Sequence, residues 1–275
     1  MSYQTIMVHL HIGRSNTALL HITRELAERF QAGVIGIMVG QPTQMIYGQG
    51  YALMDFFNKE QAQIEKEIIE AEAAFRSAFQ GFNHAIEWRS TVTMGAMAEY
   101  VAGEACSADI VLTSVAPTDF YEGPNAVSAG EIIMQAGRPV IAVPSAIKSL
   151  NLQNVLIAWK DRREARRAIV DALPILKLAT QVSVVEICAE SEVEMTEQRL
   201  ADVLAWLVRH GIAAKAMASV SVDTDATQLI AIAKQQGADL VVAGAYGHSR
   251  LRQWVLGGVT NDLLQLADFC SLLSH

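Results

Sequence analysis

Asp239-Leu240-Val241-Val242-Ala243-Gly244-Ala245-Tyr246-Gly247 is the stretch of sequence that decides the fold. The apolar run after Asp239 has the length and the β-branched content of a strand that is buried on both faces. It ends in two glycines three positions apart, and nine residues separate Gly247 from the pair Gly257-Gly258. A strand that leads into a glycine-rich loop and then into an amphipathic segment, residues 252–266, is typical of an α/β domain.

The glycines of this loop suit the binding of an anion. Glycine lets the backbone approach a ligand closely and adopt positive φ angles, and free N–H groups near a helix N-terminus favour phosphate. One helix over residues 252–266 would contain two interior glycines, at a cost of about 1 kcal/mol each. We therefore expect the helix to begin near Gly257. The spacing differs from the GxGxxG and Walker A loops, so the sequence predicts a phosphate cradle of another kind.

The order of predicted elements repeats along the chain. Apolar runs of strand length alternate with segments of helical periodicity, which implies right-handed crossovers and a parallel sheet covered by helices on both faces. Residues 108–112, Ala-Asp-Ile-Val-Leu, match residues 238–242, Ala-Asp-Leu-Val-Val. Residues 6–8 likewise match residues 155–157. The sequence therefore indicates a tandem duplication.

Each half is expected to contain five strands and four helices. In the first half we expect strands at residues 6–11, 34–39, 85–89, 109–114 and 139–143, and helices at 17–30, 58–79, 96–105 and 126–135. In the second half we expect strands at residues 154–159, 181–187, 214–220, 239–243 and 268–273, and helices at 163–177, 196–210, 225–236 and from about 257. The division then falls within residues 145–153, which gives domains at 1–148 and 149–275.

Two segments have less regular patterns. Residues 41–57 are rich in Gly, Gln, Met and aromatic side chains without clear periodicity, and we interpret them as a long loop that packs on the other half. The last predicted strand, residues 268–273, is expected to be an edge strand that pairs across the two halves, which would protect its open edge.

The spacing Gly-x2-Gly-x9-Gly, with Val259-Thr260 after Gly258, resembles the nucleotide-binding loop of the universal stress protein family. The resemblance covers nearly the whole chain. It implies two Rossmann-like domains of the adenine nucleotide α-hydrolase type, each with a five-stranded parallel sheet between helices. It also implies that the two halves pack as an intramolecular pseudo-dimer, and it leaves open whether two chains form a homodimer. The ligand that it implies is a nucleotide, ATP, with or without Mg²⁺.

Two positions depart from the pattern of the family's ATP-binding members. The residue after the last motif glycine is Ser or Thr in those members, and it is Gly258 here. An Asp that holds the nucleoside at the end of the first strand aligns with Lys160. An ammonium group can only donate hydrogen bonds, so Lys160 would suit phosphate rather than adenine or ribose.

The second half is the better candidate for a binding site. Ligands of open α/β sheets lie beyond the carboxyl ends of the strands, where the strand order reverses. The residues that we expect to bind the cofactor there are Ala158, Trp159, Lys160, Gly244, Gly247, His248, Gly257, Gly258, Val259 and Thr260. Two other interpretations stay open: Lys160 as an ordinary surface charge, and the glycines as a simple turn.

In the first half the glycine pattern is largely absent. Residues 114–117, Ser-Val-Ala-Pro, stand where Gly-x2-Gly would be, and Glu131 would place a carboxylate beside any phosphate. His11 aligns with the missing Asp, so we expect this half to serve an interface or another ligand. His9 and His11 share one face of the first strand. We interpret them as packed or hydrogen-bonded histidines, because no cluster with metal-ligand spacing accompanies them.

Composition and charge exclude several classes of function. A net charge of −8 over 275 residues gives no reason to expect nucleic-acid binding. No apolar run approaches the ~20 residues that span a bilayer, and the first residues do not resemble a signal peptide. Cys106, Cys188 and Cys270 are isolated in apolar surroundings, which is typical of reduced core thiols in a cytoplasmic protein.

The sequence contains no recognised catalytic motif, neither GxSxG nor HExxH. The leading hypothesis is a cytoplasmic stress-response protein that binds ATP or a related phosphate-bearing molecule through its C-terminal domain. The alternative, favoured by the two departures, is an interaction or assembly module with vestigial pockets. A slow nucleotide hydrolase is the third hypothesis, and it would need a base or metal that the sequence does not identify.

Overall fold

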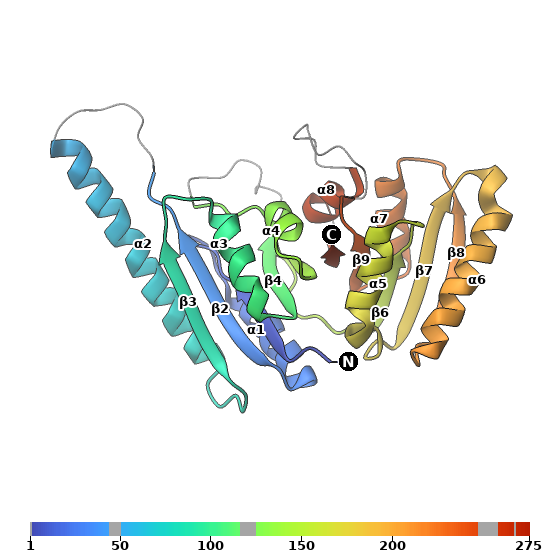
Figure 1. The fold of residues 1–275 in the computed structure, drawn as a ribbon, viewed down its shortest axis with the longest axis horizontal. Helices are drawn as coiled ribbons and strands as arrows, with labels where there is room; N and C mark the ends of the chain where they lie inside the picture. The colour runs from blue at the N-terminus through green and yellow to red at the C-terminus, as the bar shows by residue number, and fades with distance from the viewer. Residues whose placement is uncertain (1, 44–50, 116–124, 247–257, 267) are drawn as a thin grey trace. The chain divides into compact units, whose positions relative to one another are not determined.

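The computed structural model describes residues 2–43, 51–115, 125–246, 258–266 and 268–275, without the side chains of residues 51–54. It divides into two compact units, Tyr3–Arg138 and Pro139–His275. Each is an α/β unit in which helices pack on a mainly parallel sheet, as the alternation of strand and helix patterns predicts (Figure 1).

The N-terminal unit contains parallel strands in the order β3-β2-β1-β4. These are β1 Thr5–His9, β2 Gly33–Gly40, β3 Ile86–Val92 and β4 Ile110–Val115. The helices are α1 Thr17–Phe30, α2 Tyr51–Ala78, α3 Met97–Glu104 with the short η1 Ala105–Ser107, and α4 Ala129–Gln135. The chain runs from β1 through β2 to β3 on one side and returns to place β4 on the other, so the strand order reverses between β1 and β4.

The C-terminal unit has the strand order β5-β10-β9-β6-β7-β8. The strands are β5 Val140–Pro144, β6 Asn154–Ala158, β7 Gln181–Cys188, β8 Lys215–Val220, β9 Leu240–Gly244 and β10 Cys270–Ser274. The helices are α5 Arg163–Leu176, α6 Val193–Arg209 after the short η2 Glu190–Glu192, α7 Asp225–Gln235 and α8 Gly258–Gln265. Strands β6 to β10 form the five-stranded parallel sheet that was expected, and the order reverses between β6 and β9.

The last strand, β10, pairs with both halves of the sequence. It is parallel to β9 and antiparallel to β5, with Leu272 opposite Ile141. The expected pairing with the first half is confirmed, but the expectation of an edge strand is wrong, because β10 has a partner on each side. This pairing also places β5 in the C-terminal unit. The unit boundary at Arg138 and Pro139 therefore differs from the repeat boundary at 148 and 149, which stays a prediction.

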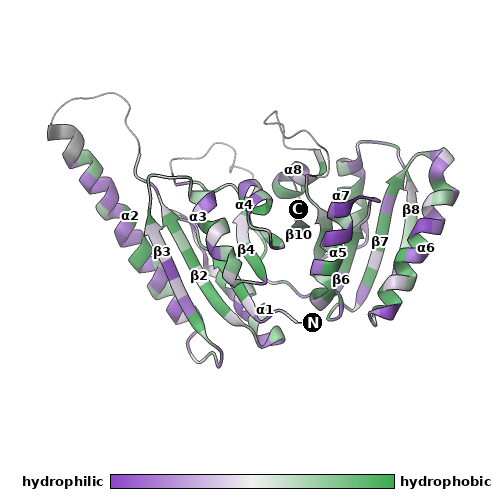
Figure 2. Cartoon of the chain, in the orientation of Figure 1, coloured by the Kyte–Doolittle hydropathy of each residue, from purple (hydrophilic) through white to green (hydrophobic). Residues whose placement is uncertain are grey.

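The central strands form the core. Ile6, Met7 and Val8 of β1 are fully buried, and Val241 and Val242 of β9 are buried to the same extent. Burying a side chain of this size stabilises the fold by about 1.5–3 kcal/mol. Polar residues are concentrated on the outward faces of helices such as α2 and α6 (Figure 2). The strand patterns in the sequence therefore report burial correctly.

Asp109 and Asp239, which match in the internal repeat, make equivalent hydrogen bonds. Oδ2 of Asp109 accepts from the backbone N–H groups of Gln4 (2.7 Å) and Thr5 (3.0 Å), and Oδ2 of Asp239 accepts from those of Gln153 (2.7 Å) and Asn154 (2.9 Å). Asp109, just before β4, thus holds the start of β1, and Asp239, just before β9, holds the start of β6 in the same way. The duplication of sequence is also a duplication of contacts.

Helix α2 begins earlier than the sequence predicts. It spans Tyr51–Ala78, so residues 51–57 are helical rather than part of a long loop. The run Tyr51-Ala52-Leu53-Met54-Asp55-Phe56-Phe57 is almost uniformly apolar, and such a run has no helical periodicity to detect. Residues 44–50 of the expected loop lie outside the described part of the chain.

Candidate functional site

The carboxyl ends of β6 and β9 bring two predicted segments together. Ala158 lies opposite Ala243 in the parallel pairing of β6 and β9. Trp159 and Lys160, which follow β6, therefore lie at the same edge of the sheet as Ala245 and Tyr246, which follow β9. This is the edge at which open α/β sheets bind ligands.

Gly244 is needed for the packing of α5. A Cβ atom at this position would lie 2.5 Å from the backbone nitrogen of Ala165 and 2.5 Å from the carbonyl carbon of Glu164. Any side chain would collide with backbone there, and backbone cannot move aside as the end of a side chain can. The first turn of α5 therefore explains Gly244 without a ligand.

The peptide group between Ala245 and Tyr246 is held on both sides. The Ala245 carbonyl accepts a hydrogen bond from Nδ1 of His275 (3.1 Å), and the Tyr246 N–H donates to Oγ1 of Thr260 (3.4 Å). The Ala245 N–H also donates to the carbonyl of Ser274 (2.8 Å). Tyr246 has a φ of 58°, a left-handed conformation that is uncommon for a residue with a side chain. The end of β10 and the first turn of α8 thus fix the start of the loop.

The start of α8 agrees with the prediction from the glycine pair. The first described residue of this helix is Gly258, and no atom of the described residues lies within 4 Å of a Cβ atom added there. Val259 is half-buried, whereas Thr260 is only 5% exposed, so its hydroxyl is used to hold Tyr246. Gly258 is itself exposed. Gly247, His248 and Gly257 lie outside the described residues.

Lys160 is directed away from Gly244 and Tyr246, the described start of the glycine loop. Its Nζ donates to the backbone carbonyl of Ile187 (2.9 Å) and lies 4.0 Å from Oδ2 of Asp225. Ile187 belongs to β7, which lies on the side of β6 opposite β9. The ammonium group therefore points away from Gly244 and Tyr246. The side chain is still 53% exposed, so it stays accessible to solvent.

Trp159 packs beneath the edge of the sheet. The residue is 9% exposed, and its backbone N–H donates to the carbonyl of Val185 (2.8 Å). Its indole Nε1 is buried and has no hydrogen-bond partner among the described residues. Ala158 before it is half-buried. Both residues lie at the sheet edge of the candidate site.

Sequence reasoning missed Glu164 and His275. Glu164, in the first turn of α5, is 5% exposed and accepts a hydrogen bond from Nε of Arg163. Burial raises the pKa of this carboxyl, but the bond from Arg163, a backbone hydrogen bond and the proximity of His275 outweigh it and lower the pKa overall. The start of this side chain lies beside Gly244, because a Cβ atom at Gly244 would lie 2.8 Å from the Cβ atom of Glu164. An acidic residue in a first helical turn is too common to identify it, and nothing local indicates that His275 meets Ala245.

The equivalent edge of the N-terminal unit contains buried histidines. Oγ1 of Thr113 lies 3.0 Å from Nδ1 of His9 and 3.0 Å from Nε2 of His11. His9 is 1% exposed and His11 is 6% exposed. Burial, and secondarily the nearby His11, lower the pKa of His9 well below its ordinary value. The structure thus confirms hydrogen-bonded histidines, and the described residues contain no group of three or more ligands placed to hold a metal.

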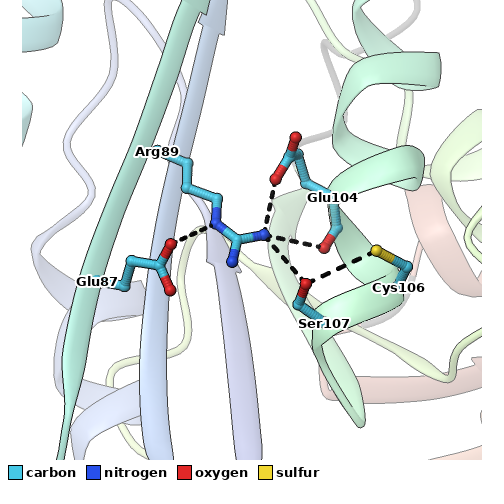
Figure 3. Close-up of polar contacts among 5 residues, drawn as sticks. All are labelled: Glu87, Arg89, Glu104, Cys106 and Ser107. Carbon is cyan, nitrogen blue, oxygen red and sulfur yellow. Dashed lines mark hydrogen bonds and ion pairs between the residues drawn. The ribbon is translucent and has the colours of Figure 1, made fainter.

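A polar cluster lies apart from both sites, on the edge strand β3 (Figure 3). The guanidinium of Arg89 contacts Oε1 of Glu87 (2.8 Å), Oε2 of Glu104 (2.7 Å) and Oγ of Ser107 (3.3 Å). The hydrogen bond from Arg89 chiefly lowers the pKa of the Glu87 carboxyl. Cys106 lies beside Ser107 with its Sγ 3.6 Å from Oγ. This arrangement secures the edge strand to the end of α3 and η1.

The cysteines are only partly as expected. Cys188 and Cys270 are buried, and burial together with Asp239 raises the pKa of the Cys270 thiol to about 12. Cys106 is exposed, so its assignment to the core was wrong. Its neighbours Ala105 and Ala108 are apolar and buried, but the short η1 turn directs the intervening residue outward. None of the helices in the described residues has the length and the apolarity needed to cross a bilayer.

Comparisons with known proteins agree with this geometry. The model of the universal stress protein family matches residues 151–273. A universal stress protein from Archaeoglobus fulgidus DSM 4304 has a TM-score of 0.73 at 12% identity, with 98% of this chain and 97% of that chain covered. A functionally unknown protein from Pseudomonas aeruginosa PAO1 has a TM-score of 0.61 at 11% identity, with 99% and 92% covered. No curated protein sequence matches the chain. At these identities, the likeness to solved structures shows the fold.

Proposed function

We propose that the C-terminal unit, in which residues 151–273 match the model of the universal stress protein family, binds a phosphate-bearing small molecule, with ATP as the first candidate. The site is the edge of the sheet beyond β6 and β9. The observation that carries the proposal is the fixed start of the loop: Thr260 and His275 hold the peptide after Ala245, and Gly258 leaves the N-terminus of α8 open.

The first turn of α8 is the preferred place for the phosphates. Its N–H groups have no partners within the helix and carry partial positive charge, which favours an anion. Glu164 lies on the other side, at the start of α5, and its lowered pKa keeps it negatively charged. Repulsion from this carboxylate directs an anion away from α5 and toward α8. Mg²⁺ would accompany ATP as the counter-ion of its phosphates.

The remaining site residues have different roles in this proposal. Ala158 and Trp159 supply an apolar floor for the nucleoside end of the ligand. Lys160 adds positive charge at the mouth while it stays bound to the Ile187 carbonyl. Gly247, His248 and Gly257 are proposed from the sequence motif. We infer a binding or regulatory protein of the cytoplasm rather than an efficient enzyme, and the three free cysteines suit a reducing compartment.

An assembly module without nucleotide is the second candidate, and two observations favour it. Lys160 is directed toward β7 and α7, and the backbone of Glu164 packs against Gly244. Under this alternative, Gly244 serves the packing of α5 alone and the loop has no ligand.

Calorimetric titration with ATP, with and without Mg²⁺, separates the two candidates. We expect saturable binding by the wild-type protein and at least tenfold weaker binding by Gly258→Val, because the added side chain blocks access to the first turn of α8. A tenfold loss corresponds to about 1.4 kcal/mol. Gly103→Val is the matched control, since Gly103 also lies in a helix with nothing within 4 Å of an added Cβ.

Each outcome has a clear meaning. Binding that is lost in Gly258→Val and kept in Gly103→Val would support the site at α8. Absence of binding by folded wild-type protein would remove ATP as the ligand and favour the assembly module. Equal binding by both variants would move the phosphates away from α8.

A further inference from the structure

The two repeats differ at the same edge of their sheets. His11 and Lys160 occupy equivalent positions, two residues after β1 and β6. His11 is 6% exposed, whereas the Lys160 side chain is 53% exposed. The residue two positions after β1 is therefore buried, whereas the residue two positions after β6 is exposed.

Helix α2 contacts the ends of β1 and β2 and is longer than its counterpart in the C-terminal unit. This helix is 28 residues long, whereas its counterpart α6 is 17 residues long. Figure 1 shows α2 running beside the sheet and projecting past the edge strand β3. Three of its residues, Glu60, Ile64 and Glu67, have the spacing that places them on one face of a helix. All three contact the ends of β1 and β2 or the residues that follow.

The two carboxylates of this face accept hydrogen bonds from the backbone. Oε2 of Glu67 accepts from the Gly13 N–H (2.9 Å), in the loop between β1 and α1. Oε2 of Glu60 accepts from the Thr43 N–H (2.9 Å), and its Oε1 accepts from the Thr43 hydroxyl (2.8 Å). Each carboxylate thus binds an amide that lies beyond a strand end.

Ile64, between these carboxylates, packs directly on the end of β2. It is 5% exposed, and a Cβ atom at Gly40 would lie only 2.3 Å from its Cγ2. Gly40 is the last residue of β2, so the missing side chain makes room for α2. This close fit indicates a built contact rather than a helix that passes by.

A hydrogen bond also links the segments that follow β2 and β4. Oδ1 of Asn125 accepts a hydrogen bond from the Gln41 N–H (2.7 Å). Asn125 follows β4 in the chain and Gln41 follows β2, while β1 lies between these strands. The bond therefore joins the segments that follow the two strands on either side of β1.

The C-terminal unit uses the equivalent amide differently. Arg162 corresponds to Gly13, and its N–H donates to the backbone carbonyl of Lys160 (2.6 Å) rather than to a carboxylate of α6. Backbone amides at the carboxyl ends of parallel strands are the groups that hold oxyanions in α/β folds. A carboxylate is itself an oxyanion, so Glu60 and Glu67 satisfy the amides of the N-terminal unit as a ligand would.

We propose that α2 is the resident occupant of an oxyanion site in the N-terminal unit, an autoinhibitory contact in which Glu67 and Glu60 hold the amides of Gly13 and Thr43. A phosphate-class oxyanion takes these amides when the carboxylates are withdrawn. In this proposal α2 occupies the strand ends of a unit that lacks the glycine motif. The proposal does not depend on nucleotide binding by the other unit.

Amide hydrogen exchange of the full chain at Gly13 and Thr43 tests the proposal. The wild-type protein is compared with Glu60→Ala/Glu67→Ala in inorganic phosphate and in chloride at equal ionic strength. In chloride we expect exchange at both amides to be at least tenfold faster in the double variant than in the wild type. Phosphate should slow the exchange of these amides in the double variant but not in the wild type, because only the double variant lacks the carboxylates that bind them.

The control is Glu65→Ala/Glu70→Ala, which removes two charges from other positions of the same helix. Glu65 is bonded to Gln61 and Glu70 is paired with Lys66, both within α2. This control should behave like the wild type. If the double variant does not fold, exchange at Gly13 is measured in the single variant Glu67→Ala. Phosphate and chloride are again compared in the variant and in the wild type.

Three results would overturn the proposal. The first is exchange in the double variant that phosphate does not slow. The second is phosphate protection of Gly13 and Thr43 in the wild type, because their amides would then be available despite α2. The third is protection by ATP without protection by inorganic phosphate, since recognition would then require a nucleoside rather than an oxyanion.

Discussion

At the scale of single residues, His9 couples the fold to pH. Its ring is buried and bonded to Thr113, and both burial and the neighbouring His11 lower its pKa. In the unfolded chain a histidine titrates near pH ~6.5. Below that pH, the unfolded state binds a proton that folded His9 does not bind. The folded state therefore loses stability as the pH falls through ~6.5 and keeps the full contribution above it.

We expect His9→Asn to weaken this pH dependence. Asparagine can retain a hydrogen bond to Thr113 but does not titrate. Between pH ~6 and ~5, one unbound proton changes the free energy of unfolding by at most about 1.4 kcal/mol per pH unit, and the variant should lack this slope. Urea unfolding at several pH values measures it. The control is His84→Asn at an exposed position, and equal slopes in wild type and His9→Asn would contradict the assignment.

At the scale of elements, the contact between β9 and α5 distinguishes Gly244, which the packing requires, from Gly258, which we propose for ligand binding. Gly244 allows the backbone at Glu164 and Ala165 to approach within 2.5 Å of the place of a Cβ atom. Gly258 at the start of α8 has no such neighbour. The same motif thus contains one glycine required for packing and another whose open surroundings leave it available to a ligand.

Gly244→Ala should therefore destabilise the protein even without ligand. Forcing a methyl group into backbone at this distance should cost about 1–3 kcal/mol, in the range of overpacked cores. Gly103→Ala, in an open helical position, should be neutral or stabilising by up to about 1 kcal/mol. Urea denaturation of both variants measures the difference. Unchanged stability of Gly244→Ala would show that α5 adjusts, and the ligand interpretation of Gly244 would regain weight.

At the scale of the whole molecule, the pairing of β5 with β10 decides where the chain can be divided. The sequence repeat predicts domains at 1–148 and 149–275, whereas β5 belongs to the compact unit that begins at Pro139. A fragment of residues 149–275 would leave one edge of β10 without its partner. Open apolar edges of this kind favour association between chains.

We expect residues 139–275 to be more stable than residues 149–275 when each is expressed alone. The shorter fragment should also self-associate as its concentration rises, because the exposed edge of β10 has unpaired backbone N–H and C=O groups that can bind a strand of another molecule. Thermal unfolding and light scattering after size exclusion measure both properties. Two fragments of equal stability that are both monomeric would show that the repeat boundary, and not the β5 pairing, limits the folding unit.

The sequence by itself determined the repeat and the order of elements. Helix Thr17–Phe30 begins and ends as its apolar spacing predicts, and Gly258 begins α8 as the cost of interior glycines predicts. These features follow from periodicity and from residue preferences over short stretches, and both can be read without knowing which distant residues meet.

Only the tertiary structure decided which residues meet at the carboxyl ends of the strands in each unit. It placed Lys160 on the β7 side of β6, brought His275 to Ala245, set Glu164 against Gly244 and laid α2 over the ends of β1 and β2. Each of these contacts joins residues far apart in the sequence. Spacing and propensity fix the face of a helix or strand on which a residue lies. The packing of neighbouring elements determines which partner the charged end of a long lysine or glutamate side chain contacts.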